Sequence, residues 1–181
     1  EPLASRKVVE VGCGAGKNLL QLIRLGFAPE HLRGVELIDD RAARARRCLP
    51  ATVEIATGDA LALPVPPASV DIAYQSVVFS SILDTEFRRT LAARMWEWVR
   101  PGGGVLWYDF VFNNPSNPDV RGVPVRELRA LFPEGAIRLR RVTLAPPLSR
   151  RVTRVCPALY GVFNALPLLR THVLAWIQKR P

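Results

Sequence analysis

The chain alternates between short apolar runs and stretches in which apolar residues recur at helical spacing. The apolar runs predict seven strands, at Val8–Val11, Arg33–Ile38, Thr52–Ala56, Val70–Ser76, Val105–Val111, Ala136–Leu144 and His172–Lys179. The helical stretches predict helices at Lys17–Arg24, Asp39–Leu49, Asp84–Val99 and Val125–Leu131. Strands that alternate with helices are typical of an α/β fold, in which helices cover a parallel sheet.

Two further segments complete this expected architecture. The run "RPGGG" (100–104) predicts a turn that ends the third of these helices before the next strand begins. The longest uncharged run, Val155–Leu169, has fifteen residues and contains Pro157 and Pro167. It is shorter than the ~20 residues that cross a bilayer. We therefore expect a helical insertion at 144–169, either buried or covering the substrate, and no stable insertion into a membrane.

Length and composition indicate an ordinary globular protein. The 181 residues, 49% of them hydrophobic and 23% charged, fit a single domain that spans 1–181. The three cysteines are few and widely spaced, so we expect a reducing compartment and no metal site. No signal peptide is visible, which predicts a cytoplasmic location. Seven residues precede the first predicted strand, so we also expect N-terminal cap helices to be absent.

The segment "VVEVGCGAGKNLL" (8–20) places three glycines at alternate positions between the first strand and the first helix. Such a turn lets the backbone approach a ligand at the carboxyl edge of the sheet. Dinucleotide-binding turns follow G-x-G-x-x-G, but here the third glycine comes one residue early and Lys17 stands in its place. A phosphate-binding G-K-[S/T] ending is also missing. The turn therefore favours a ligand without a phosphate at this position.

The spacing E-x-G-x-G-x-G resembles motif I of the class I S-adenosylmethionine-dependent methyltransferases. Four later segments resemble this family in the same order: "GVELIDD", "ATGDALALP", "VDIAYQSVVFSSI" and "LAARMWEWVRPGGGVLWYDF". The chain is similar to the small-molecule, type 11-like branch of the family. This resemblance implies a Rossmann-like, doubly wound sheet of seven strands with helices on both faces. The sheet would be mostly parallel, with an antiparallel last strand beside the fifth.

The same resemblance implies S-adenosylmethionine as the cofactor and S-adenosylhomocysteine as the product. Glu36, at the end of the second strand, would accept hydrogen bonds from both ribose hydroxyls. Asp59 and Ala60 would contact the adenine. The full set of expected cofactor-binding residues is Glu10, Gly12, Cys13, Gly14, Gly16, Asn18, Glu36, Leu37, Asp59, Ala60 and Gln75.

The acceptor of the methyl group is less closely defined by the sequence. Family members that methylate amino or amide nitrogens often carry [N/D]-P-P-[Y/F] after the fourth strand, whereas this chain has "QSVVF" (75–79) there. We therefore expect O-methylation of a small molecule or of a glycan- or lipid-linked acceptor. Candidate catalytic residues are His172, Asp109 and Tyr108. Candidate substrate-binding residues are Phe79, Asn113, Asn114 and Arg121.

The formal net charge of +9 leaves other partners open. It permits a nucleic acid, an anionic lipid or a phosphorylated substrate, or it reflects a basic surface exposed to solvent. An RNA methyltransferase is the second choice, because the basic runs "RAARARR" and "RLRRV" contain no aromatic residues for base stacking. A third alternative is a non-catalytic relative of the same fold that acts as a partner subunit.

Overall fold

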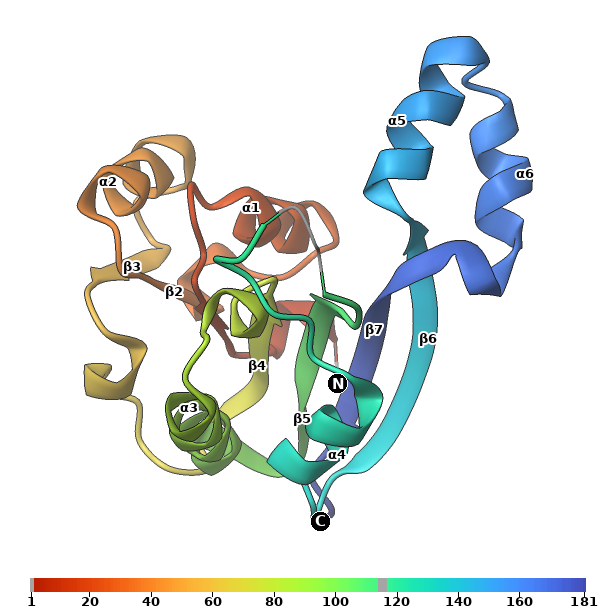
Figure 1. Ribbon diagram of the computed structural model, residues 1–181. Helices are drawn as coiled ribbons and strands as arrows, with labels where there is room; N and C mark the ends of the chain where they lie inside the picture. Colours follow the sequence, from red (N-terminus) through yellow and green to blue (C-terminus); the bar gives the residue numbers. More distant parts are fainter. Residues whose placement is uncertain (1, 114–116) are drawn as a thin grey trace.

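The computed structural model describes residues 2–113 and 117–181 and contains a seven-stranded sheet with helices on both faces (Figure 1). The strands are β1 (Val8–Val11), β2 (Leu32–Glu36), β3 (Glu54–Thr57), β4 (Val70–Ser76), β5 (Val99–Phe110), β6 (Ala136–Leu144) and β7 (Arg170–Gln178). Their order across the sheet is β3-β2-β1-β4-β5-β7-β6. Because the order reverses between β1 and β4, a crevice opens there at the carboxyl edge of the parallel strands.

The strand directions confirm the predicted Rossmann-like sheet with an antiparallel last strand. β1 runs parallel to both β2 and β4, and β4 runs parallel to β5. β7 lies between β5 and β6 and runs antiparallel to both. Its first residues therefore lie at the same edge as the ends of the parallel strands, with His172 paired to Phe110.

The described residues form six α-helices beside the sheet: α1 (Lys17–Arg24), α2 (Asp39–Cys48), α3 (Thr85–Trp98), α4 (Val125–Leu131), α5 (Pro146–Val155) and α6 (Leu159–Ala165). The Asp84 carboxylate caps α3 by accepting hydrogen bonds from the backbone N–H groups of Glu86 and Phe87. Successive residues of β1 point to opposite faces. Val9 and Val11 join the core under α3 and α4, and Val8 joins the core under α1 and α2.

The Pro-Gly run at 100–104 is not the turn that the sequence predicts. α3 passes directly into β5 at Val99, and the run forms an irregular start of that strand, where the register with β4 shifts. A Cβ atom on Gly103 would lie 2.5 Å from the carbonyl oxygen of Asp71. The glycine therefore allows the two strands to approach closely, which a composition-based turn prediction does not anticipate.

The segment between β6 and β7 also differs from the expectation. It forms a hairpin of two helices, α5 and α6, that projects beyond the sheet (Figure 1). Pro157 lies in the break between these helices, so the uncharged run does not form one helix. The run is not buried either, since Val155 is 83% exposed and Leu168 is 88% exposed. No helix in the described ranges combines the length and the apolar composition that a membrane crossing requires.

Candidate active site

A cavity of about 380 Å³ lies at the carboxyl edge of β1, β2 and β4. It is lined by residues from the glycine turn, the end of β2, the turn after β3 and the turn after β4. The lining residues include Gly12, Gly14, Glu36, Leu37, Asp59, Ala60 and Val77. The structure thus brings together residues that are far apart in the sequence, at the position where open α/β sheets bind ligands.

At two positions of the turn, glycine is required by the backbone conformation or by the lack of space for a side chain. Gly12 has a φ of +65°, and a Cβ atom there would lie 2.5 Å from the Val78 Cγ2 atom. Gly14 has a φ of +56°, faces open space and donates its N–H to Glu36 Oε2 at 2.8 Å. Both backbone conformations are unfavourable for other residues. Without side chains, the turn leaves the cavity free and holds the Glu36 carboxylate.

Glu36 forms the wall of the cavity at the end of β2. Its side chain is largely buried, and its two carboxylate oxygens accept N–H groups from Gly14 and from Ile38, the latter at 3.0 Å. Each carboxylate oxygen can accept more than one hydrogen bond. The fixed carboxylate can therefore accept hydrogen bonds from two further donors, such as neighbouring hydroxyl groups of a ligand.

Glu10 lies just before the glycine turn and is fully buried. Its Oε1 atom accepts a hydrogen bond from Asn18 Nδ2 at 2.7 Å, whereas Oε2 has no partner among the described residues. Burial raises the pKa of Glu10 to about 8; the nearby Glu36 charge adds to this, and the Asn18 hydrogen bond opposes it. Glu10 is therefore protonated at neutral pH, and its unpartnered oxygen is buried, since Glu10 is not among the residues that line the cavity.

The other expected cofactor-binding residues are placed in two groups. Leu37, Asp59 and Ala60 line the cavity, and the Asp59 side chain also accepts the Leu61 N–H. Gly16, Asn18, Cys13 and Gln75 are not among the residues that line it. The Cys13 thiol packs beside Gly34 in the core under α1 and α2, and burial raises its pKa to about 12. Its side chain is thus a small packing group and not a ligand contact.

Gln75 supports the turn after β4 from within the protein. Its buried side chain accepts the Val78 N–H at 3.1 Å and donates to the Tyr108 carbonyl at 3.4 Å. The intervening Val77 has a φ of +60°, which is rare for a β-branched residue, and donates its N–H to the same carbonyl at 2.8 Å. Backbone conformations of this kind persist where the surroundings enforce them, and they are concentrated at functional sites.

A second cavity of about 450 Å³ lies on the other side of Val77. Two of its lining residues, His172 and Asn113, are among the residues that the sequence indicates. Its other lining residues include Phe110, Phe112, Val120, Arg150 and Thr171. Because Val77 lines both cavities, the two spaces adjoin at the end of β4.

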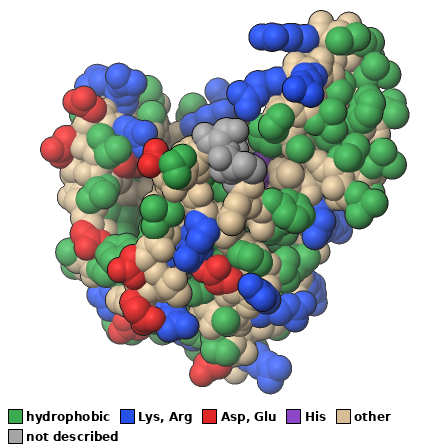
Figure 2. Space-filling view, viewed as in Figure 1, with side chains coloured by type: hydrophobic (Ala, Val, Ile, Leu, Met, Phe, Trp, Pro, Cys, Tyr) green, Lys and Arg blue, Asp and Glu red, His purple; other side chains and the backbone are tan. Residues whose placement is uncertain are grey.

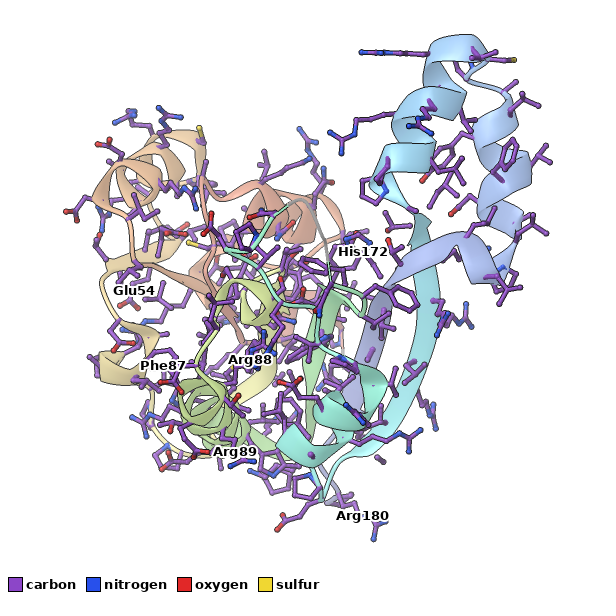
Figure 3. All side chains as sticks on the ribbon, in the orientation of Figure 1. Glu54, Phe87, Arg88, Arg89, His172 and Arg180 are labelled. Carbon is purple, nitrogen blue, oxygen red and sulfur yellow. The ribbon has the colours of Figure 1, made fainter. Side chains whose placement is uncertain are left out.

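His172 opens onto the second cavity from the start of β7 (Figure 3). Its ring stacks on Tyr108, with ring centroids 5.1 Å apart, and its Nδ1 atom lies 3.1 Å from the Thr171 hydroxyl. Burial lowers the pKa of His172, so the imidazole is neutral at pH 7. The Tyr108 hydroxyl is within hydrogen-bond distance of Thr143. Of the three candidate catalytic residues, His172 is the one that lines a cavity.

Asp109 is placed away from both cavities. It is 1% exposed, and its carboxylate accepts the N–H groups of Ser80 and Phe110. Burial raises its pKa, although these hydrogen bonds and the Arg88 charge oppose the effect.

The fully buried Arg88, which the sequence did not single out, donates to Glu127 at 2.7 Å and to the Arg121 carbonyl at 2.9 Å (Figure 3). These contacts fix the segment after β5 against α3 and α4.

Two of the expected substrate-binding residues lie elsewhere in the structure. Phe79 is fully buried and packs on Trp107 at a centroid distance of 4.5 Å, so it belongs to the core. The Arg121 side chain donates to Thr85 at 3.2 Å and to Glu127 at 3.4 Å, and it lines neither cavity. Asn113 accepts the Gly122 N–H and lines the second cavity. Asn114 lies outside the described residues.

Comparison with known proteins places the chain in a family. The methyltransferase-domain family matches residues 8–103, more than half of the chain, so the chain belongs to this family. It is 32% identical over 123 residues to the O-methyltransferase cnsE of Penicillium expansum, a match that covers 65% of this chain but 42% of that protein. The family match and the fold together show that the chain is a class I S-adenosylmethionine-dependent methyltransferase.

Solved structures show the same fold at low sequence identity. A S-adenosylmethionine-dependent methyltransferase from Archaeoglobus fulgidus superposes with a TM-score of 0.72 at 15% identity, over 97% of this chain and 88% of that chain. The phosphoethanolamine N-methyltransferase 1 of Haemonchus contortus, solved with S-adenosylhomocysteine, superposes with a TM-score of 0.66 at 14% identity. That match covers all of this chain and 40% of the nematode protein.

S-adenosylmethionine is the cofactor of this family, and the first cavity fits its chemistry. Glu36 presents two carboxylate oxygens suited to a pair of ribose hydroxyls. The glycine turn offers backbone groups and open space without a lysine-serine ending for phosphate. These residues would therefore hold the cofactor.

Proposed function

We propose that this protein is an S-adenosylmethionine-dependent O-methyltransferase whose acceptor is a small molecule or a glycan- or lipid-linked hydroxyl. The observation that carries the proposal is the pair of adjoining cavities with Val77 as their common wall. The first carries the residues suited to the cofactor, and the second carries a histidine and an arginine among apolar residues. A donor space next to an acceptor space is what a group transfer requires.

The chain's contribution to the reaction is alignment and protection from water. The bound cofactor supplies a methyl group that is already activated by its positive sulfur. Gly12 and Gly14 leave room for the cofactor, while Glu36 and Asp59 would hold the ribose and the adenine of its adenosine part. Val77, held by Gln75 and the Tyr108 carbonyl, sets the distance between the two cavities. A rigid wall at this point favours one approach direction for the acceptor.

The second cavity fits an acceptor with an apolar body, a polar head and an anionic group. Phe110 and Phe112 supply apolar surface, Asn113 supplies amide groups and Arg150 supplies a cation. The absence of an [N/D]-P-P-[Y/F] sequence after β4 favours oxygen over nitrogen as the acceptor atom. The name of the Penicillium relative, an O-methyltransferase, agrees with this preference.

His172 is the general base in this proposal. It lines the second cavity, and its lowered pKa keeps the imidazole neutral and able to accept a proton from a hydroxyl at pH 7. Stacking on Tyr108 and the contact with Thr171 fix the orientation of the ring. Asp109 has no part in this proposal, because it is 1% exposed and is not among the lining residues of either cavity.

Transfer of a tritiated methyl group from S-adenosylmethionine tests the proposal. Octyl glucoside and octylphenol serve as hydroxyl acceptors with an apolar tail, and octylamine serves as the matched amine. We expect label in the hydroxyl compounds. The His172→Gln variant should transfer ~10²–10⁴-fold more slowly with unchanged S-adenosylhomocysteine affinity. In the natural chain, protonation of His172 should lower the rate at acid pH, and in the His172→Gln variant this decrease should be absent. Faster labelling of octylamine than of both hydroxyl compounds would contradict the proposal.

A further inference from the structure

The charge of this protein is concentrated at its C-terminal end. All 16 acidic residues lie at or before Glu134, and nine of the 25 basic residues follow it, so residues 135–181 carry the whole net charge of +9. This part of the chain forms β6, α5, α6 and β7. The nine basic residues are Arg138, Arg140, Arg141, Arg150, Arg151, Arg154, Arg170, Lys179 and Arg180. The positive field of the molecule is therefore strongest around the projecting hairpin and the strands that carry it.

The same hairpin exposes a set of aliphatic side chains. They are Val155 (83% exposed), Leu159 (40%), Val162 (63%), Leu166 (53%) and Leu168 (88%). Figure 2 shows hydrophobic side chains gathered on the outer side of the projection, with basic side chains at its tip and on its inner side. Contiguous apolar surface of this kind on a projecting element marks an interaction site.

The hairpin is held in place at its base. Arg170 donates to the carbonyl of Asn164 at 2.6 Å and to that of Arg141 at 3.1 Å, and the Ala145 N–H donates to Leu169. Val152 of α5 is buried. The exposed aliphatic side chains are therefore presented by a preformed element, so that ordering this element does not oppose binding.

Exposed aliphatic residues beside arginines match the surface of an anionic bilayer. Apolar side chains enter the boundary of the acyl chains, while arginines extend to the lipid phosphates. An RNA partner would account for the charge but not for the aliphatic residues. The two aromatic side chains of the hairpin, Tyr160 and Phe163, are partly buried and poorly suited to base stacking.

We propose that the α5–α6 hairpin docks this protein on anionic phospholipid bilayers, with its aliphatic side in the interfacial region. Pro146, Pro147 and Arg150, at the start of α5, line the second cavity, so the hairpin that docks also forms part of the acceptor cavity. A lipid-linked acceptor can then reach the cavity without leaving the membrane. This last consequence rests on the proposed function, whereas docking itself does not.

Co-sedimentation of the full chain with vesicles tests the docking. Vesicles of phosphatidylserine with phosphatidylcholine are compared with vesicles of phosphatidylcholine alone, without cofactor or acceptor. We expect binding to the anionic vesicles that weakens as salt is raised. Replacing Arg151 and Arg154 by Ala should weaken this binding by about 30-fold, since each arginine near an anionic surface contributes about fivefold. Neither residue lines a cavity.

The apolar side is tested separately by Val162→Ser with Leu168→Ser. Their matched control is Leu25→Ser, because Leu25 is 65% exposed at the end of α1. The double variant should lose most vesicle binding, and the control should retain it. Binding of S-adenosylhomocysteine is measured for every variant. A variant that binds it is folded, so that a loss of vesicle binding in that variant reports on docking and not on the proposed catalysis. Three results would overturn the proposal: equal vesicle binding by the double variant, preferential binding of a single-stranded RNA oligonucleotide, or a dimer that the serine substitutions dissociate.

Discussion

The substitution Glu10→Gln isolates one buried ionisable group. The glutamine amide has the shape of the carboxylic acid and can still accept the Asn18 hydrogen bond, but it does not titrate. Burial raises the folded-state pKa of Glu10 from 4.5 to about 8, which corresponds to about 5 kcal/mol at about 1.4 kcal/mol per pH unit. Since the folded pKa is raised, the stabilisation is fully present below pH 4.5 and is lost as the pH rises through 8.

Urea unfolding at several pH values measures this effect. Between about pH 5 and pH 7, the free energy of unfolding of the natural chain should fall by about 3 kcal/mol more than that of Glu10→Gln. Other titrating groups, including Asp109, contribute equally to both proteins and cancel in the comparison. An equal pH dependence in the two proteins would refute the reasoning, because it would mean that Glu10 is ionised or solvated in the folded state.

Two further substitutions test the supports of the site. Phe79→Ala should lower the free energy of unfolding by ~3–5 kcal/mol, as for other buried aromatic residues, because Phe79 fills the core beside Trp107; a loss below about 1 kcal/mol in urea unfolding would place Phe79 in the acceptor space after all. Gln75→Ala leaves the Val78 N–H without its partner, so we expect a loss of ~1–3 kcal/mol in stability and weaker S-adenosylhomocysteine binding. A calorimetric affinity equal to that of the natural chain would show that the Val77 turn holds its shape without Gln75.

Much of the architecture follows from regular features of the sequence. The alternation of apolar runs and helical stretches predicts the α/β class of the fold. The glycine turn, Glu36 and Asp59 are predicted to form one ligand site, and the structure brings them to one cavity. These features are local, or they depend only on all parallel strands ending at one edge. For the same reason His172, at the start of an antiparallel strand, could be placed at that edge.

The direction of side chains in irregular segments could not be predicted. The positive φ of Val77 turns the chain after β4, so that Val77 lines both cavities and Phe79 points into the core. Nothing in "QSVVF" signals this conformation. The partners of the Arg121 side chain, Thr85 and Glu127, could not be predicted, because the contacts of a long side chain depend on tertiary packing. The burial of Arg88 could not be predicted either, because arginines usually lie at the surface and two of its partners, Glu127 and Arg121, come from a distant segment.

The exposed hairpin shows a different limit of the sequence. An uncharged run with aliphatic residues predicts burial, because burial is the usual way to remove apolar surface from water. Here Pro157 divides the run into two helices, and the hairpin leaves the sheet, so the aliphatic side chains of Val155 and Leu168 remain exposed. Hydrophobicity alone did not distinguish a core helix from a projecting hairpin.

Calorimetric titration with S-adenosylhomocysteine tests the central claim most directly. We expect saturable binding at one site per chain and no binding of NAD, because the glycine turn lacks the third glycine of dinucleotide-binding turns. In Glu36→Ala the affinity should fall by ~1–3 kcal/mol through loss of the carboxylate that accepts the ribose hydroxyls. Tight binding of NAD with no heat from S-adenosylhomocysteine, or an unchanged affinity in a folded Glu36→Ala variant, would contradict the account.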